Sequence, residues 1–168
     1  INENISDKSK TSFARVYSAL GFFYSLIKSY DKTEKYFSKY SMIVKNELGE
    51  DSLAYASSLS ALASVSGYKN DFARAFELSE EVANIYIKLG DTSGMGYVSA
   101  SMNMAQNSLL LGNIEKAKNI SEKFLNHPDK SIRAQALAIL AMINASLNNF
   151  YAAESQYEAA LQLLKEYM

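Results

Sequence analysis

The sequence predicts an all-α fold built from repeated units, and three observations lead to that prediction. The small residues Thr33, Ala75, Ala117 and Ala153 each end a similar motif, and they stand 42, 42 and 36 residues apart. A near-constant period in this range indicates a stacked repeat. Apolar residues also recur at the three- and four-residue spacing of amphipathic helices. Finally, the 168 residues include one Pro and seven Gly, which suits a helical chain because both are costly inside helices.

The repeated motif reads polar, polar, large apolar, two variable residues and small. Its clear copies are 70–75 (NDFARA), 112–117 (GNIEKA) and 148–153 (NNFYAA), and a weaker copy ends at Thr33. Thirteen positions before each small residue stands a large apolar residue followed by a small one. These pairs are Leu20-Gly21, Leu62-Ala63, Met104-Ala105 and Leu140-Ala141. Small residues at such positions let two helices approach to about 8–10 Å.

This pattern resembles the tetratricopeptide repeat, and the 42-residue period resembles that of kinesin light chains and of bacterial regulator arrays. The resemblance implies an all-α, right-handed α-solenoid of about four helix–turn–helix units, or eight helices. The units expected in this single array of residues 1–168 are about 14–55, 56–97, 98–133 and 134–168. Residues 1–10 are expected to be frayed or to end a preceding helix. The chain departs from the family pattern at its tryptophan position, which holds Tyr17, Leu59, Ser101 and Leu137.

The first four helices are expected at about 11–29, 31–48, 52–67 and 71–89. Asp31 with Glu34 has the spacing of a capping box, which would start the second helix. Gly49 would end that helix, because glycine adopts the left-handed conformation without strain. Asp51 and Ser52 then start the third helix, and Gly90 ends the fourth.

The last four helices are expected at about 93–111, 114–126, 130–147 and from Phe150 to near the end. Pro128 stops the sixth helix early, since proline cannot continue a helix and restrains the residue before it. This early stop accounts for the shorter third interval of 36 residues. Asp129 is the expected N-cap of the seventh helix.

Composition excludes several classes of function. The formal net charge is −1, so the chain offers no basic field for nucleic acid. No apolar run approaches the length of about 20 residues that a membrane span needs. With no Cys and a single His, His127 in a predicted turn, the sequence indicates no metal site, no cofactor and no enzyme. Absence of Cys favours neither the cytosol nor an oxidising compartment. Because the chain begins at Ile1, it is interpreted as a piece of a longer protein or a processed one.

The family resemblance implies that the first helix of each unit lines a concave groove that contacts a partner. The residues carried over to this groove are Arg15, Ser18, Phe22, Ser60, Ser64, Ser99, Met102, Asn103, Gln106, Gln135, Ile139 and Met142. The groove has one cation, Arg15, so a clamp for a charged carboxylate tail is disfavoured. A neutral peptide whose main-chain amides meet Ser, Asn and Gln fits better. The alternative is that small residues stand here only to let neighbouring units pack.

The leading functional hypothesis is a non-enzymatic scaffold that binds a protein or peptide in the groove. The alternative is a sensory or regulatory segment of a larger bacterial signalling protein, a kinase or transcription regulator. It rests on the 42-residue period and the junction at 88–94 (KLGDTSG), and flanking sequence would discriminate the two. The last helix carries Tyr157, Leu161 and Leu164 with few charges. We therefore expect either further helix after Met168 or self-association through this helix.

Overall fold

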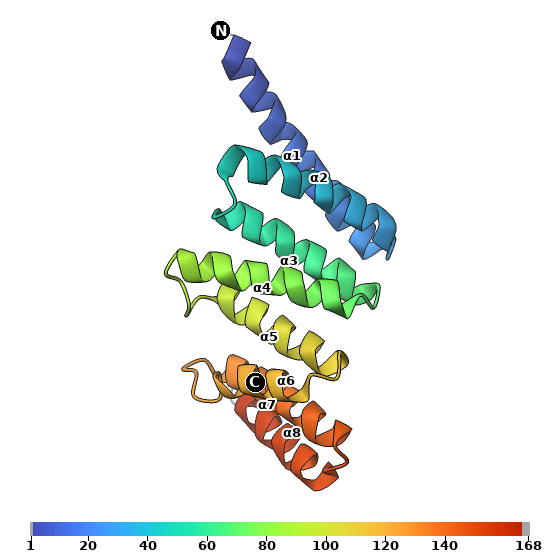
Figure 1. The fold of residues 1–168 in the computed structure, drawn as a ribbon, viewed down its shortest axis with the longest axis vertical. Coiled ribbons are helices and arrows are strands. Elements are labelled where there is room, and N and C mark those ends of the chain that lie inside the picture. Colours follow the sequence, from blue (N-terminus) through green and yellow to red (C-terminus); the bar gives the residue numbers. More distant parts are fainter. Residues whose placement is uncertain (1, 166–168) are drawn as a thin grey trace. The chain divides into compact units, whose positions relative to one another are not determined.

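The computed structural model describes residues 2–165, and its side chains from residue 10 onward with the exception of residue 11. The described residues form eight helices and no strand (Figure 1). The helices are α1 (Asn2–Leu26), α2 (Tyr30–Leu48), α3 (Leu53–Tyr68), α4 (Phe72–Lys88), α5 (Met95–Leu110), α6 (Ile114–Glu122), α7 (Lys130–Ser146) and α8 (Phe150–Lys165). The all-α prediction is confirmed. The chain divides into two compact units, Ile1–Tyr97 and Val98–Met168.

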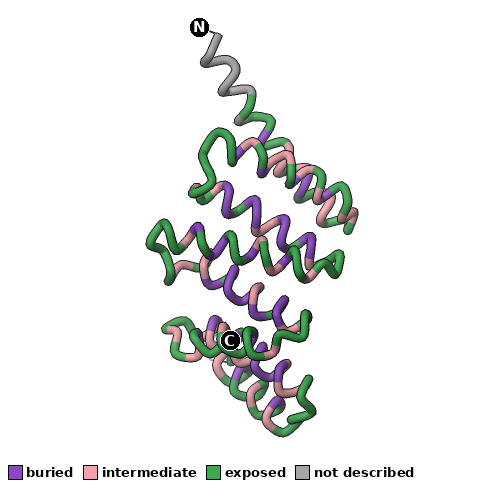
Figure 2. Tube along the Cα trace, in the orientation of Figure 1, coloured by how far each residue is buried: buried purple, intermediate pink, exposed green. Residues whose placement is uncertain are grey.

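Packing within each unit joins helices that are neighbours in the chain. In the first unit α1 packs on α2, α2 on α3 and α3 on α4, while in the second unit α6 packs on α7 and α7 on α8. Buried residues run along the facing sides of these helices (Figure 2). Between α2 and α3 the core consists of Phe37, Leu62 and Val65, with Tyr30, Tyr40, Ala61 and Leu78 packed around it.

The turn inside each helix pair repeats with the same backbone geometry. One residue in each turn has a positive φ: Lys28 (56°), Asn70 (61°), Gly112 (79°) and Asn148 (62°). The next residue's N–H then donates to a carbonyl five residues back, in the Schellman pattern. These bonds are Ser29–Tyr24 (2.9 Å), Asp71–Ser66 (2.9 Å), Asn113–Ser108 (2.8 Å) and Asn149–Asn144 (2.8 Å). The turns lie 42, 42 and 36 residues apart, so the backbone obeys the predicted repeat register.

The small residues predicted at the helix crossings are all buried. Thr33 and Ala117 have no exposed surface, Ala75 is 1% exposed and Ala153 is 4% exposed. The second small residues, Gly21, Ala63, Ala105 and Ala141, are buried as well. Burial at both sets of positions confirms the register that the sequence predicts.

Helix boundaries differ from the expected ones at two places. Residues 2–10 form the first turns of α1, which ends at Leu26 rather than near residue 29. Helix α6 ends at Glu122, four residues before the expected end. The chain after it closes tighter turns, in which the N–H of Phe124 donates to Ser121 (3.1 Å) and that of His127 to Phe124 (3.1 Å). Three-residue bonds of this kind end a helix before the restraint that Pro128 imposes.

The predicted helix ends are mostly correct, with one exception. Gly49 has φ 87° after α2, and the hydroxyl of Ser52 accepts a bond from the N–H of Tyr55 (3.2 Å) at the start of α3. Asp129 accepts a bond from the N–H of Ser131 (2.7 Å) at the start of α7. The capping box of Asp31 and Glu34 is wrong. The N-cap of α2 is Ser29, which makes no side-chain cap, and both carboxylates bind Lys69 instead.

Candidate interaction surface

Charge is separated between the two helices of each pair. Helices α3 and α5 contain no charged residue, and α7 has only Lys130 and Arg133 in its first turn. In α1, the stretch 13–26 has only Arg15. The second helices α2, α4, α6 and α8 all carry both acidic and basic residues. The first-helix surface is thus nearly neutral along its described length.

In the first unit, the predicted groove residues on α1 and α3 are accessible. Arg15, Phe22 and Ser64 are exposed, with Phe22 61% exposed, and Ser18 and Ser60 are half-buried. The hydroxyl of Ser60 donates to the carbonyl of Ala56 (3.0 Å), and that of Ser64 donates to Ser60 (3.0 Å). Each hydroxyl proton is therefore used within the helix, and each oxygen still offers lone pairs to an incoming N–H.

In the second unit, the structure separates the predicted residues on α5 and α7 into two groups. Ser99, Gln106 and Gln135 are exposed, and Asn103 and Met142 are half-buried. Met102 is 6% exposed and Ile139 is 8% exposed, so both side chains lie mostly inside the packed fold. Both are large apolar side chains, and removing them from water is favourable wherever packing can accept them. Repeat position alone does not predict that these two side chains are buried.

The side-chain amides of Asn103 and Gln106 are the groups on α5 best placed to meet a partner. Within the described part of the chain, no hydrogen bond engages either side-chain amide, since the bond that the Asn107 side chain donates to Asn103 (2.8 Å) ends on its main-chain carbonyl. An amide offers two donors and an acceptor. These two residues can therefore bond both the N–H and the C=O groups of a peptide.

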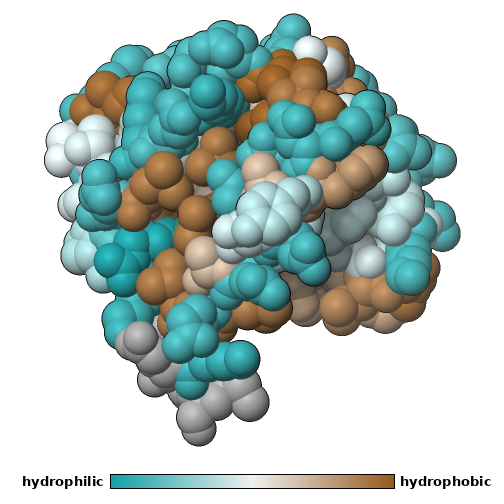
Figure 3. All heavy atoms as spheres, turned by 90° about the horizontal axis from the view of Figure 1, so that it is seen from below, coloured by the Kyte–Doolittle hydropathy of each residue, from teal (hydrophilic) through white to brown (hydrophobic). Residues whose placement is uncertain are grey.

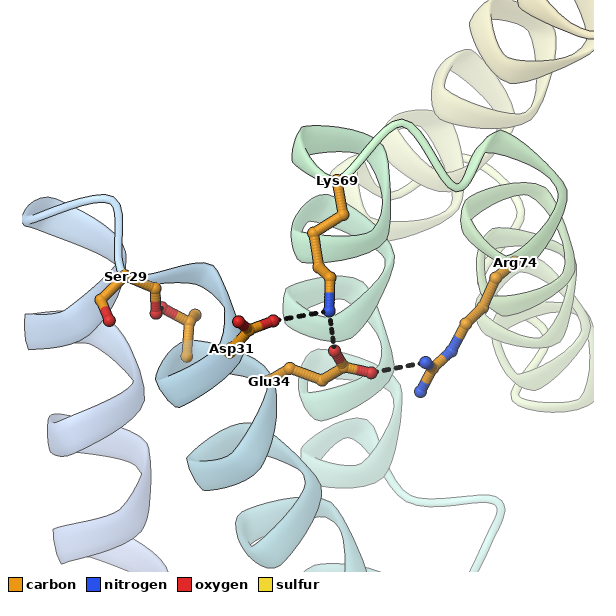
Figure 4. Close-up of polar contacts among 6 residues, drawn as sticks. Ser29, Asp31, Glu34, Lys69 and Arg74 are labelled. Atoms are coloured by element: carbon orange, nitrogen blue, oxygen red, sulfur yellow. Dashed lines mark hydrogen bonds and ion pairs between the residues drawn. The ribbon is translucent and has the colours of Figure 1, made fainter.

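Charged groups of α2, of α4 and of the turn between α3 and α4 tie neighbouring helix pairs together inside the first compact unit. The Lys69 ammonium lies between the Asp31 and Glu34 carboxylates, at 2.9 and 2.8 Å, and Arg74 bonds the other oxygen of Glu34 (Figure 4). This network ties the start of α2 to the turn between α3 and α4. The hydrogen bond from Lys69 and the charge and bond of Arg74 lower the pKa of Glu34, against the raising effect of partial burial.

The lowered pKa of Glu34 predicts a pH-dependent loss of stability. Its contribution is complete above the ordinary carboxyl pKa of 4.5 and is lost as pH falls through the lower folded-state value. Because its partners are largely exposed, Glu34→Gln should lower the free energy of unfolding at pH 7 by only about 1 kcal/mol or less. Thermal unfolding at several pH values measures this. The variant and the native chain should converge in acid, whereas Glu77→Gln, an exposed carboxylate on α4, should match the native chain throughout.

The described residues present no grouping of three His, Asp or Glu side chains that could hold a metal ion. His127 accepts a bond at Nδ1 from the N–H of Asp129 (3.1 Å), so it helps to shape the turn before α7. In the described part of the chain, no helix combines the length and hydropathy of a membrane span.

Comparison with known families and structures identifies the class of fold. The tetratricopeptide repeat family model matches residues 12–88. No match is found among curated proteins. This match identifies residues 12–88 as a tetratricopeptide-repeat segment, as the sequence predicted, and the repeated turns and buried crossing residues continue the same helix-pair pattern through the later described residues. Domains of this class are generally protein-interaction scaffolds and are typically non-catalytic.

Three solved structures illustrate the similarity of fold. BtubC (BKLC) from P. vanneervenii is 18% identical, with a TM-score of 0.78 over 92% of this chain and 64% of that protein. A Podosopora anserina protein with kinesin light chain TPR-like repeats is 14% identical, with a TM-score of 0.76 over 92% of this chain and 76% of its own. MamA is 12% identical, with a TM-score of 0.52 over 93% and 94%. At these identities the likeness establishes the fold alone.

Proposed function

We propose that the chain is a non-enzymatic scaffold whose first helices bind an uncharged stretch of a partner protein. The observation that carries this proposal is the separation of charge, since α3 and α5 contain no charged residue. A neutral surface cannot repay the desolvation of a charged ligand, because no opposite charge faces it. A peptide with few charges loses less on binding.

The polar groups on this surface suit main-chain recognition. Ser60 and Ser64 offer acceptor oxygens, while Asn103 and Gln106 offer both donors and acceptors. Such groups bond peptide N–H and C=O groups, which are common to all sequences. Phe22, which is 61% exposed, and the half-buried Met142 add apolar contact, so a peptide with spaced apolar residues is favoured.

Selection from a displayed library of random peptides tests this function. Enriched peptides should have few charged residues, and their affinity should change little between low and high salt, because the first helices offer few charges that salt could screen. Enrichment of strongly acidic or basic peptides with a steep salt dependence would overturn the proposal.

The double variant Asn103→Ala/Gln106→Ala should weaken the selected peptides by roughly tenfold or more, as expected when two hydrogen bonds of about 1 kcal/mol each are lost. Its thermal unfolding should match that of the native chain, since neither side-chain amide bonds within the described protein. The matched control is Asn84→Ala, an exposed amide on the second helix α4, which should leave peptide affinity unchanged. Isothermal titration with one selected peptide gives all three affinities.

A further inference from the structure

Large apolar side chains are strongly exposed on the first helix, α1, with the residue after it, and on the last helix, α8. At the α1 end they are Phe13 (54%), Val16 (53%), Phe23 (52%) and Ile27 (57%). On α8 they are Tyr151 (87%), Tyr157 (41%), Leu161 (58%) and Leu164 (41%). Figure 3 shows hydrophobic patches between hydrophilic side chains on one face of the molecule. Grouped exposure of this kind marks association surfaces.

The α2–α3 interface in the first unit shows how residues at these repeat positions pack when a neighbouring helix covers them. The second helix α2 packs on the next first helix α3. Phe37 of α2 lies in one buried cluster with Leu62 and Val65 of α3. Beside this cluster, the hydroxyl of Ser58 on α3 bonds the hydroxyl of Ser41 on α2 (2.9 Å).

The repeat register relates this interface to both exposed faces. Thr33 and Ala153 are equivalent and 120 residues apart, so α8 matches α2 at that offset, and α1 matches α3 at an offset of 42. The α2 residues Phe37, Ser41 and Val44 correspond to Tyr157, Leu161 and Leu164 of α8. The α3 residues Ser58, Leu62 and Val65 correspond to Val16, Leu20 and Phe23 of α1. The two apolar faces are thus the two halves of one interface type.

We propose that α8 of one copy of this chain packs on α1 of a second copy, as α2 packs on α3. Tyr157 meets Leu20 and Phe23 of the second copy. Leu161 meets Val16, and this apolar contact replaces the hydroxyl pair of the α2–α3 interface. The contact joins two different surfaces, so it is heterologous and can continue from copy to copy as an open chain. This surface is separate from the peptide-binding surface proposed above.

A hollow in the second unit shows where the incoming leucine sits. An open hollow of about 370 Å³ between α7 and α8 is lined by Arg133, Leu137, Ala159, Gln162, Leu163 and, from the segment after α6, Leu125. In the repeat register Leu125 is the equivalent of Leu161. Leu125, which holds this position in the preceding repeat, therefore closes the edge of the hollow.

A matching hollow lies in the first unit, and its lining has no counterpart of Leu125. It measures about 360 Å³ and is lined by Lys10, Phe13, Tyr17, Lys39, Met42 and Ile43, all from α1 and α2. Five of these lining positions correspond in register to the lining of the α7–α8 hollow. Leu161 of a second copy supplies the missing edge, as Leu125 does in the second unit.

Charged groups at the rim match in the same register. Glu34 of α2 forms an ion pair with Arg74 of α4. In the repeat register, Glu154 on α8 is the equivalent of Glu34, and Lys32 on α2 is the equivalent of Arg74. Within the described residues Lys32 forms no ion pair, and its ammonium lies over the Tyr24 ring at 4.9 Å. Glu154 of one copy and Lys32 of the next are therefore complementary.

A cation–aromatic contact also has its equivalent. The Lys45 ammonium of α2 lies over the Tyr55 ring of α3 at 5.6 Å. The corresponding residues are Lys165 on α8 and Phe13 on α1. The proposed contact thus places an ammonium group over an aromatic face again. The repeat register thus places an apolar core, an ion pair and a cation–aromatic pair between α8 of one copy and the first two helices of the next.

Sedimentation velocity with two complementary variants tests the proposal. Leu161→Glu/Leu164→Glu disrupts the α8 face, and Val16→Glu/Phe23→Glu disrupts the α1 face. The native chain should form species that lengthen with concentration, and each variant alone should be monomeric. An equal mixture should form a one-to-one dimer that grows no further, because each variant supplies the one intact face that the other lacks. Circular dichroism should show the native helix content for both variants.

Each alternative occupant gives a different result. If α8 paired with α8, the α1-face variant would still dimerise alone, which would overturn the head-to-tail contact. If only flanking segments of a longer protein or another protein covered these faces, the native chain would stay monomeric at every concentration, which would also overturn it. Asn84→Glu, on an exposed position of α4, should associate as the native chain does.

A charge exchange provides an independent check of register. Glu154→Lys should weaken association roughly five- to tenfold, since it brings two cations together at the rim. Adding Lys32→Glu to the same chain should restore the native association constant. A double variant as weak as the single one would contradict the alignment of α8 on α1.

Discussion

Ala75→Leu is expected to lower the free energy of unfolding by about 1–3 kcal/mol, and Ala117→Leu by a similar amount or more. Ala75 is 1% exposed and Ala117 has no exposed surface, and both stand where the two helices of a pair cross. Three extra carbon atoms there must push the helices apart or force strained rotamers. Alanine and leucine have similar helix propensities, so the loss reports packing rather than helix formation.

Thermal unfolding followed by circular dichroism measures these changes. For a chain of this size, each kcal/mol should lower the melting temperature by roughly 2–4 °C. The control is Ala73→Leu, the same substitution two residues earlier at an exposed position of α4. Melting temperatures that fall equally for Ala73→Leu and Ala75→Leu would show that helix crossing is not the cause.

The sequence predicts the fold well because the small residues at the crossings record a local packing requirement. Thr33, Ala75, Ala117 and Ala153 can be found by spacing alone, and all four are buried. The repeated turn was harder to find. Of the four positive-φ residues in the turns inside the helix pairs, one is Gly and two are Asn, which favour that conformation, whereas Lys28 gives no such signal. Only the register reveals Lys28 as the equivalent of Gly112.

The predictions that failed involve contacts between distant parts of the sequence. Asp31 and Glu34 have capping-box spacing, but Lys69 is 38 and 35 residues away and binds both carboxylates. A local pattern cannot show that a cation from the next helix pair competes for its side chains. Met102 and Ile139 are buried although their repeat position is one of the expected groove, because repeat position does not tell how far a large side chain turns towards the packed interior.

Helix crossings in this chain show a complementarity of size. In the first pair Gly21 lies against the ring of Phe37, and a methyl group at Gly21 would come within 2.6 Å of its Cδ1 atom. The equivalent positions hold Ala63 with Ser79 in the second repeat, and Ala105 with Ser121 in the third. In these three repeats a larger residue on one helix accompanies a smaller one on the other, whereas the fourth repeat holds Ala141 with Tyr157 and does not follow this rule. The large ring of Phe37 also reaches α3, which explains its place in the α2–α3 core.

Phe37→Ala is expected to lower the free energy of unfolding by about 3–5 kcal/mol, the largest effect among these predictions. The side chain is 9% exposed and forms one cluster with Leu62 and Val65, so its removal leaves a cavity between α2 and α3. Gly21→Ala alone should also destabilise, by about 1–3 kcal/mol from overpacking, less a gain of about 1 kcal/mol in helix propensity.

The double variant Gly21→Ala/Phe37→Ala separates packing from propensity. Removing the ring removes the obstacle, so Gly21→Ala should become neutral or stabilising in the Phe37→Ala background. The expected coupling between the two positions is about 1–3 kcal/mol, measured by chemical denaturation of the four chains in a double-mutant cycle. Gly67→Ala on α3 is the control, since a methyl group there meets no atom within 4 Å. Strict additivity at 21 and 37 would mean that the ring and the glycine do not meet.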